Sequence, residues 1–175
     1  LDIVVDGALR KTENLMAETD TVILEIPGRG EREVEIFLPH LAQVWFRRIE
    51  PNAPYTKIPQ KEKLWLFLGD SITQGMHSKH PALTYPVLSA QRMGCDFINM
   101  GVCGATFYAD DIDAPERKPD FITVAFGCND WKQAKDKESF RENARTFLER
   151  LTNVFTCRNI CGILPIWRSD EENVY

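Results

Sequence analysis

A surplus of positive charge is missing from this sequence. Lysine and arginine number 21 against 26 aspartate and glutamate residues, so the formal net charge is −5 at pH 7. A protein that holds a nucleic acid backbone or an anionic membrane surface usually carries clustered basic side chains. We therefore expect neither a nucleic acid nor a membrane as a partner.

Long hydrophobic runs are also missing. The longest strongly apolar run, residues 64–68, is far shorter than the roughly 20 residues that a membrane-spanning helix needs. No charged stretch followed by an apolar stretch opens the chain, so we expect a cytoplasmic protein. Because the sequence begins at Leu1 rather than Met and stops at Tyr175 without a visible closing element, we expect both ends to be cut.

Cysteine, glycine and proline are too few for several classes of protein. The five cysteines are an odd number, and the pair Cys157 and Cys161 has no second pair that would complete a zinc site. We expect reduced thiols and no metal. Ten glycines and ten prolines, with 43% hydrophobic residues, exclude collagen-like, low-complexity and wholly disordered chains. The 175 residues suit one ordinary domain, or a small module joined to a larger one.

Residues 1–60 are expected to form a partial β-sandwich-like module and a linker. The candidate strands are residues 21–26, 33–38 and 43–49. Pro-Gly-Arg-Gly at residues 27–30 is a turn signal, so the first two strands are expected to pair as a hairpin. The polar residues 57–63 have the composition of a linker. A few strands bury little by themselves, which predicts an incomplete module rather than a free-standing domain.

Residues 61–175 alternate short apolar strands with helices, which is typical of an α/β domain with a parallel sheet. The expected strands are residues 64–68, 96–99, 120–126 and 161–167, and the expected helices are residues 85–93 and 140–155. Apolar residues at helical spacing support the second helix. Ser139 and Glu142 predict a capping box at its start.

Small polar loops follow three of these strands, and ligands of parallel α/β sheets bind beyond the carboxyl ends of the strands. The loops are Gly-Asp-Ser at residues 69–71, Asn-Met-Gly-Val-Cys-Gly at residues 99–104, and Gly-Cys-Asn-Asp at residues 127–130. We expect Gly69 to allow a sharp turn, and Ser71 to stand at a helix N-terminus, where an oxyanion is favoured. Each loop also has a structural explanation, namely a helix cap, a glycine turn and an Asx-turn.

Taken together, the three loops resemble the SGNH hydrolases, also called the GDSL esterase and lipase family, over residues 64–175. The resemblance implies a three-layer α/β/α, flavodoxin-like fold that hydrolyses esters and thioesters with a serine nucleophile and without metal or cofactor. It implies that Ser71 is the nucleophile. It also implies an oxyanion hole formed by the backbone N–H groups of Ser71 and Gly104 and the side-chain amide of Asn129. Cys103 departs mildly from the family pattern, and we expect Asp70 and Asp130 to be structural.

The catalytic base of this family, the histidine of a late Asp-x-x-His block, is missing. None of the three histidines, His40, His77 and His80, has an aspartate three residues before it. His77 and His80 follow Ser71 too closely to reach back to it easily, and His40 belongs to the β-module. The family's fifth strand and closing helix are also missing, so we expect these elements and the base beyond Tyr175.

The residues and the resemblance leave several functions open. The first is a serine esterase that acts on a small-molecule ester with a short acyl or acetyl group. Residues 34–39, followed by residues 43–49, are similar to the last strands of a β-sandwich that precedes some bacterial SGNH proteins, which suggests acylated carbohydrates as substrates by analogy. The alternative is a non-catalytic ligand-binding or scaffold protein. A long-chain lipase or thioesterase would need an extended apolar surface that the sequence does not indicate.

Overall fold

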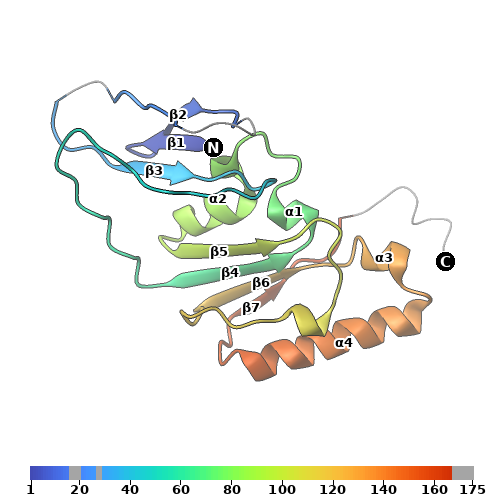
Figure 1. The fold of residues 1–175 in the computed structure, drawn as a ribbon. Coiled ribbons are helices and arrows are strands. Elements are labelled where there is room, and N and C mark those ends of the chain that lie inside the picture. Colours follow the sequence, from blue (N-terminus) through green and yellow to red (C-terminus); the bar gives the residue numbers. More distant parts are fainter. Residues whose placement is uncertain (16–20, 27–28, 167–175) are drawn as a thin grey trace.

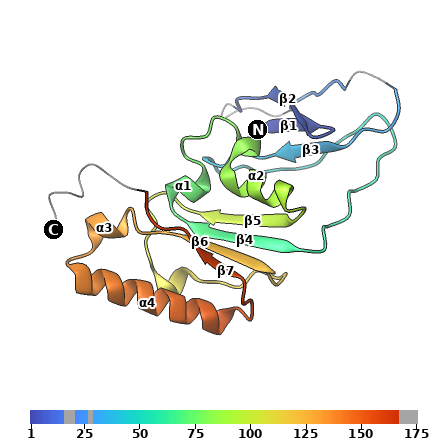
Figure 2. The same cartoon turned by 180° about the vertical axis from the view of Figure 1, so that it is seen from behind.

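Two sheets make up the protein in the computed structural model, which describes residues 1–15, 21–26 and 29–166 (Figure 1). The N-terminal sheet is antiparallel with the order β2-β1-β3, and the second sheet is parallel with the order β5-β4-β6-β7. Figures 1 and 2 place α2 between the two sheets and α4 on the opposite face of the parallel sheet. The expected α/β domain with a preceding β-module is therefore confirmed, while the domain boundary near residue 60 stays a prediction.

The N-terminal sheet pairs differently from the sequence-based expectation. Its strands are β1 (Asp2–Val5), β2 (Ala8–Thr12) and β3 (Val34–Phe37). The hairpin joins β1 to β2 through Asp6 and Gly7, whose φ angles of 51° and 74° suit the two-residue turn for which Asp-Gly is a strong signal. The hairpin expected between residues 21–26 and 33–38 is therefore wrong, and the Asp-Gly signal at residues 6–7 marks the observed one.

Two of the three strands expected in the β-module are wrong. Residues 21–26 and 43–49 form no strand, and only the segment around β3 does. The apolar side chains of the second segment do not pack on a sheet, because Trp45 is 85% exposed and Phe46 is 56% exposed. Strand β1 is instead buried along its whole length and forms the centre of the sheet. Residues 27–28 of the expected turn lie outside the described residues.

All four expected strands of the parallel sheet are present. They are β4 (Leu64–Gly69), β5 (Asp96–Gly101), β6 (Phe121–Ala125) and β7 (Ile160–Gly162). Strand β7 ends earlier than expected. Pro165 lies in the segment after it, and because proline has no N–H to donate, it could not have served as an ordinary ladder residue.

The two expected helices are present as α2 and α4, and a short helix begins at Ser71 as expected. The helical segments are α1 (Ser71–Gln74), η1 (Pro81–Leu83), α2 (Tyr85–Arg92), η2 (Ala109–Asp111), α3 (Asp130–Gln133) and α4 (Lys137–Val154). No helix of the described residues combines the length and apolar character needed to cross a membrane.

Helix α4 starts three residues before the expected start, so the expected Ser139–Glu142 capping box is wrong. The N-cap is Asp136, whose Oδ1 accepts from the Ser139 N–H at 2.8 Å, while the Asp136 N–H donates to the Ser139 hydroxyl at 3.0 Å. Asp136 is a strong N-cap residue, and its negative charge suits the positive end of the helix dipole.

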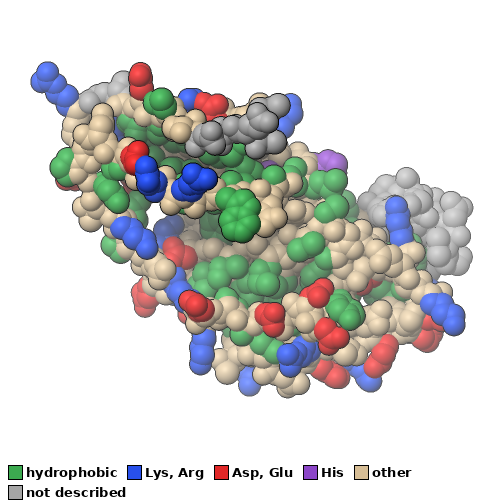
Figure 3. Space-filling view, in the orientation of Figure 1, with side chains coloured by type: hydrophobic (Ala, Val, Ile, Leu, Met, Phe, Trp, Pro, Cys, Tyr) green, Lys and Arg blue, Asp and Glu red, His purple; other side chains and the backbone are tan. Residues whose placement is uncertain are grey.

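The two faces of α4 differ. Phe147 and Leu151 are buried against Leu66 and Ile122 of the parallel sheet. Acidic and basic side chains mix along the lower part of the molecule in Figure 3, over α4. The helix is thus fixed to the sheet by one apolar stripe.

Candidate active site

Three loops meet at one edge of the parallel sheet because the strands that precede them end at the same level. Gly69 at the end of β4 is aligned with Gly101 on β5 and with Ala125 on β6. Strand β4 lies between the other two in the sheet. The loops that carry Ser71, Gly104 and Asn129 therefore leave neighbouring strands in the same direction.

Ser71 is the first residue of α1, and its side chain is not used as a helix cap. The N-cap is the buried Asp70, whose Oδ1 accepts from the Ile72 N–H at 2.9 Å. Among the described residues, neither the hydroxyl nor the backbone N–H of Ser71 has a hydrogen-bond partner. The structural role expected for Asp70 is thus present, and it leaves Ser71 available.

Gly69 does not provide the sharp turn that the sequence suggested. It is the last residue of β4, and its φ lies outside the left-handed region. A Cβ atom at this position would lie 2.0 Å from Oγ1 of Thr73 and 2.8 Å from the carbonyl oxygen of Ala125. Glycine is needed here because α1 and β6 approach the backbone too closely for any side chain.

Gly104 lies in the loop after β5 with φ at 80°, a conformation that glycine adopts without strain. Its N–H has no hydrogen-bond partner among the described residues. The neighbouring Cys103 N–H donates to Oε1 of Gln74 at 2.8 Å, which joins this loop to α1. The loop is therefore attached to the helix of Ser71 through a side chain that the sequence did not single out.

Asn129 precedes α3, but its side chain does not cap that helix. Its Nδ2 donates to the carbonyl oxygen of Ala105 at 3.0 Å. An amide nitrogen carries two protons, so this bond orients the side chain and leaves the second N–H, which has no partner among the described residues. The Asx-turn that would have explained Asn129 as a purely local feature is absent from this part of the described chain.

Asp130 holds the second and third loops together. Its Oδ1 accepts from the Phe107 N–H at 2.7 Å, and its Oδ2 accepts from the Gly127 N–H at 3.0 Å. Burial raises the pKa of the Asp130 carboxyl above its usual range, and the backbone hydrogen bonds oppose that rise only in part. Asp130 thus has the structural role that the sequence suggested.

An apolar cavity of about 220 Å³ adjoins the first and third loops. Its lining includes Ile72, Tyr85, Phe126, Cys128 and residues 163–166. The Tyr85 hydroxyl lies 2.8 Å from Oγ1 of Thr73, and burial raises the pKa of Tyr85. Sequence reasoning missed this cavity, although the apolar residues that follow β7 were a signal for it.

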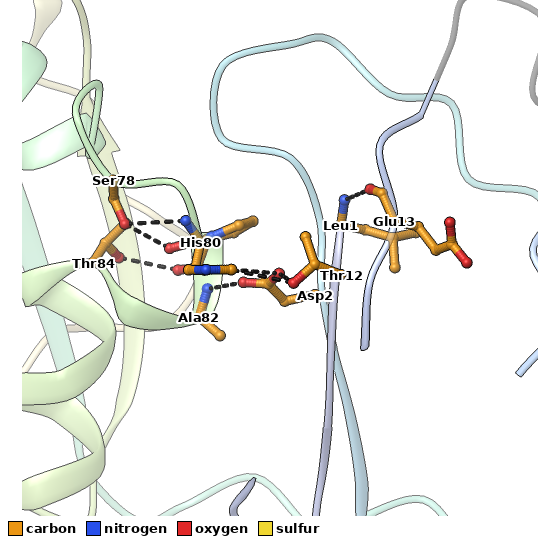
Figure 4. A network of polar contacts seen from close by, with 9 residues as sticks. Leu1, Asp2, Thr12, Glu13, Ser78, His80, Ala82 and Thr84 are labelled. Carbon is orange, nitrogen blue, oxygen red and sulfur yellow. Dashed lines mark hydrogen bonds and ion pairs between the residues drawn. The ribbon is translucent and has the colours of Figure 1, made fainter. Parts of the chain in front are cut away.

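None of the three histidines is hydrogen-bonded to Ser71. His40 contacts the carbonyl oxygen of Gly75 through Nε2 at 2.7 Å, and His77 is exposed without a partner among the described residues. Figure 4 shows His80 facing the β-module, where its Nδ1 lies 3.2 Å from the Thr12 hydroxyl and 3.4 Å from the Asp2 carboxylate. In the described part of the chain, no group of three or more His, Cys, Asp or Glu side chains could hold a metal ion.

The structure thus combines a parallel α/β sheet with a serine at the start of the helix that follows its first strand. The model of the GDSL-like lipase/acylhydrolase family matches residues 67–174. The chain therefore belongs to this family, which confirms its resemblance to the SGNH hydrolases. None of the curated protein sequences matches the chain.

Solved structures with a similar fold cover this chain to different extents. The salicylyl-acyltransferase SsfX3 from a tetracycline biosynthetic pathway aligns with a TM-score of 0.69 and 22% identity over 91% of this chain and 47% of that chain. A family two carbohydrate esterase from Clostridium thermocellum, in complex with cellohexaose, aligns with a TM-score of 0.55 and 13% identity over 68% of this chain and 48% of that chain. At these identities the similarity shows the fold alone. The chain spans about half the length of both structures.

Proposed function

We propose that this chain carries the nucleophile and the oxyanion hole of a serine esterase. The observation that carries the proposal is the set of hydrogen bonds that joins the three loops, Gln74 to Cys103 and Asn129 to Ala105, around donors that remain unpaired in the described chain. The unpaired donors are the N–H groups of Ser71 and Gly104 and the second amide N–H of Asn129. Three such donors suit the negative charge that develops on an ester carbonyl oxygen during attack.

The proposed reaction begins when Ser71 Oγ bonds to the ester carbonyl carbon and its proton passes to a general base. The carbonyl oxygen becomes an oxyanion held by the three donors. When the tetrahedral intermediate collapses, the bond to the alcohol oxygen breaks, the alcohol leaves with the proton, and the acyl group stays on Ser71. Water then repeats the sequence and releases the acid. The base in this scheme comes from an Asp-x-x-His block and not from His40, His77 or His80.

Short acyl groups are the proposed substrates. The apolar cavity beside Ile72 and Cys128, the neighbours of Ser71 and Asn129, has a volume of about 220 Å³, which is below the roughly 300–1,000 Å³ of sites for drug-sized ligands. An acetyl or similarly short group suits such a space, whereas a long chain would extend beyond it. A carbohydrate as the alcohol part rests on analogy with the β-module of related proteins and on the fold shared with the carbohydrate esterase.

The test is hydrolysis of p-nitrophenyl esters of increasing chain length by the protein expressed from the complete gene. We expect turnover of the acetate that falls as the acyl chain lengthens, and loss of turnover in Ser71→Ala. Ser89→Ala, on α2, is the matched control and keeps the activity. Undiminished turnover in Ser71→Ala would refute the proposal, and a preference for long chains would indicate a lipase or thioesterase instead.

A non-catalytic binding or scaffold role is the second candidate, because none of the three histidines is hydrogen-bonded to Ser71. Labelling with a fluorophosphonate separates the two functions. An esterase is modified at Ser71, and prior incubation with a slowly hydrolysed ester blocks the label. A non-catalytic protein leaves Ser71 unmodified while its fold is intact by circular dichroism.

A further inference from the structure

We infer that Gln74 is a positioning residue that holds the Gly104 loop in place beside Ser71, and that His40 of the β-module holds Gln74 in turn. The inference rests on the proposed function, since Gly104 is a proposed oxyanion donor. It assigns the β-module a part in the reaction. The module does not need to touch the substrate to play this part.

Gln74 uses both ends of its side-chain amide. Oε1 accepts from the Cys103 N–H at 2.8 Å, and Nε2 donates to the carbonyl oxygen of His40 at 3.0 Å. A flipped amide would place donor against donor at Cys103 and acceptor against acceptor at His40. The two partners therefore allow only one orientation of this side chain.

The backbone of Gln74 is anchored in the helix of Ser71. Its N–H donates to the carbonyl oxygen of Asp70 at 2.9 Å, and Gln74 is the last residue of α1. One residue thus links the nucleophile helix, the loop after β5 and the β-module. These segments are distant in sequence, since Gln74 lies 34 residues after His40 and 29 residues before Cys103.

His40 contacts the end of α1 through its ring as well as through its carbonyl oxygen. Its Nε2 lies 2.7 Å from the carbonyl oxygen of Gly75, and because a carbonyl only accepts, Nε2 carries the proton. The Nδ1 atom is buried without a partner among the described residues. A Cβ atom on Gly75 would lie 3.2 Å from Cδ2 of His40 and 2.4 Å from Cγ2 of Thr84. The ring of His40 thus packs closely against the residue that follows Gln74.

Loss of the Gln74 hydrogen bonds should affect the transition state more than substrate binding. Oxyanion donors act when they lie about 2.7–3.1 Å from the developing charge, and a misplacement of about 1 Å can cost about 100-fold in rate. Cys103 is adjacent to Gly104, so loss of its bond to Gln74 frees the loop that carries the donor. We expect kcat to fall while KM changes little.

The test compares Gln74→Met, which removes both hydrogen bonds, with Gln74→Glu, which keeps an acceptor for the Cys103 N–H. On p-nitrophenyl acetate we expect kcat to fall about 10- to 100-fold in Gln74→Met with KM within about threefold, and to fall less in Gln74→Glu. Gln91→Met, an exposed position on α2, is the matched control and retains the kcat of the unaltered protein.

Hydrogen exchange supplies a readout that does not depend on turnover. The peptide that contains residues 101–106 should exchange faster in Gln74→Met, while exchange in α4 is unchanged. Unchanged kcat, a change in KM alone, or unchanged exchange of this peptide would each overturn the inference. If Gln74→Met does not fold, Gln74→Glu against Gln91→Met decides. Absence of turnover and of fluorophosphonate labelling in the unaltered protein would instead refute the esterase proposal. The exchange measurement would still test whether Gln74 holds the Gly104 loop.

Discussion

The side chain of Asn129 donates a hydrogen bond to the carbonyl oxygen of Ala105, 3.0 Å away, instead of capping the helix that follows it. The bond joins the loop after β6 to the loop after β5. It commits one amide proton and leaves the other, which makes Asn129 the most specific residue for a test of the proposed oxyanion hole.

Asn129→Ala should lower kcat on p-nitrophenyl acetate by about 100- to 1,000-fold, the usual effect of removing one oxyanion donor. Circular dichroism should show an intact fold. Asn153→Ala, at an exposed position on α4, is the control and should keep full activity. Equal turnover in the two variants would exclude Asn129 from the site.

Asp2→Asn should destabilise the protein in a pH-dependent way. Asp2 is fully buried and accepts from the Ala82 N–H at 3.0 Å and from the Thr12 hydroxyl at 2.8 Å. Burial by itself would raise the pKa of Asp2, but the hydrogen bonds from Ala82, Thr12 and His80 together lower it below 3.8. An acid with a lowered folded-state pKa adds stability above its unfolded pKa and loses that stability as the pH falls.

The expected loss for Asp2→Asn at pH 7 is about 1–3 kcal/mol in the free energy of unfolding, because buried donors lose an acceptor. The loss should shrink as the pH falls below about 3.8. Urea denaturation across this pH range measures it. Asp113→Asn, at an exposed position, should show no comparable loss. A pH-independent effect of Asp2→Asn would mean that the charge of Asp2 does not stabilise the fold.

Leu151→Ala should lower the free energy of unfolding by about 2–5 kcal/mol, because it leaves a cavity between α4 and the parallel sheet. Leu151 is fully buried, whereas Leu148 on the same helix is 44% exposed. Leu148→Ala should therefore cost about 1 kcal/mol or less. Urea denaturation of both variants gives the comparison, and equal losses would mean that α4 is not packed through this stripe.

Asp136→Ala should lower the midpoint of urea unfolding, because it removes the acceptor for the Ser139 N–H at the start of α4. Glu142→Ala should leave the midpoint nearly unchanged, since Glu142 is an exposed helix residue that pairs with Arg145. The pair of variants discriminates between the observed cap and the one that local sequence pattern suggested. A larger effect at Glu142 would favour the later helix start.

The parallel sheet was predictable because its strands are short apolar runs. Such strands must be buried on both faces, which is typical of a parallel sheet. The antiparallel sheet was not predictable, because the β-branched and aromatic residues of a segment such as residues 43–49 fit a strand without indicating which strand it would pair with. The Asp-Gly signal at residues 6–7 was available in the sequence. It is local, and it correctly marks the hairpin between β1 and β2.

The candidate site was predictable to the level of its three loops. Ser71, Gly104 and Asn129 remain proposals for catalytic roles, and the structural roles expected for Asp70 and Asp130 are present as hydrogen bonds to backbone N–H groups. The position of Gln74 in the sequence did not indicate a structural role. Its partners lie about 30 residues away on either side, so nothing in its local sequence indicated that its amide would be fully used.

The amino-acid sequence by itself determined the class of fold and the order of the three polar loops, because both follow from local patterns of apolar strands and the residues that end them. Only the tertiary structure decided which donors stay unpaired and which segments hold the loops together. Strand register brings Gly69, Gly101 and Ala125 to one level, and hydrogen bonds between distant residues depend on that register. Local pattern indicated the apolar strands of the parallel sheet, but it does not encode which partner each polar group meets.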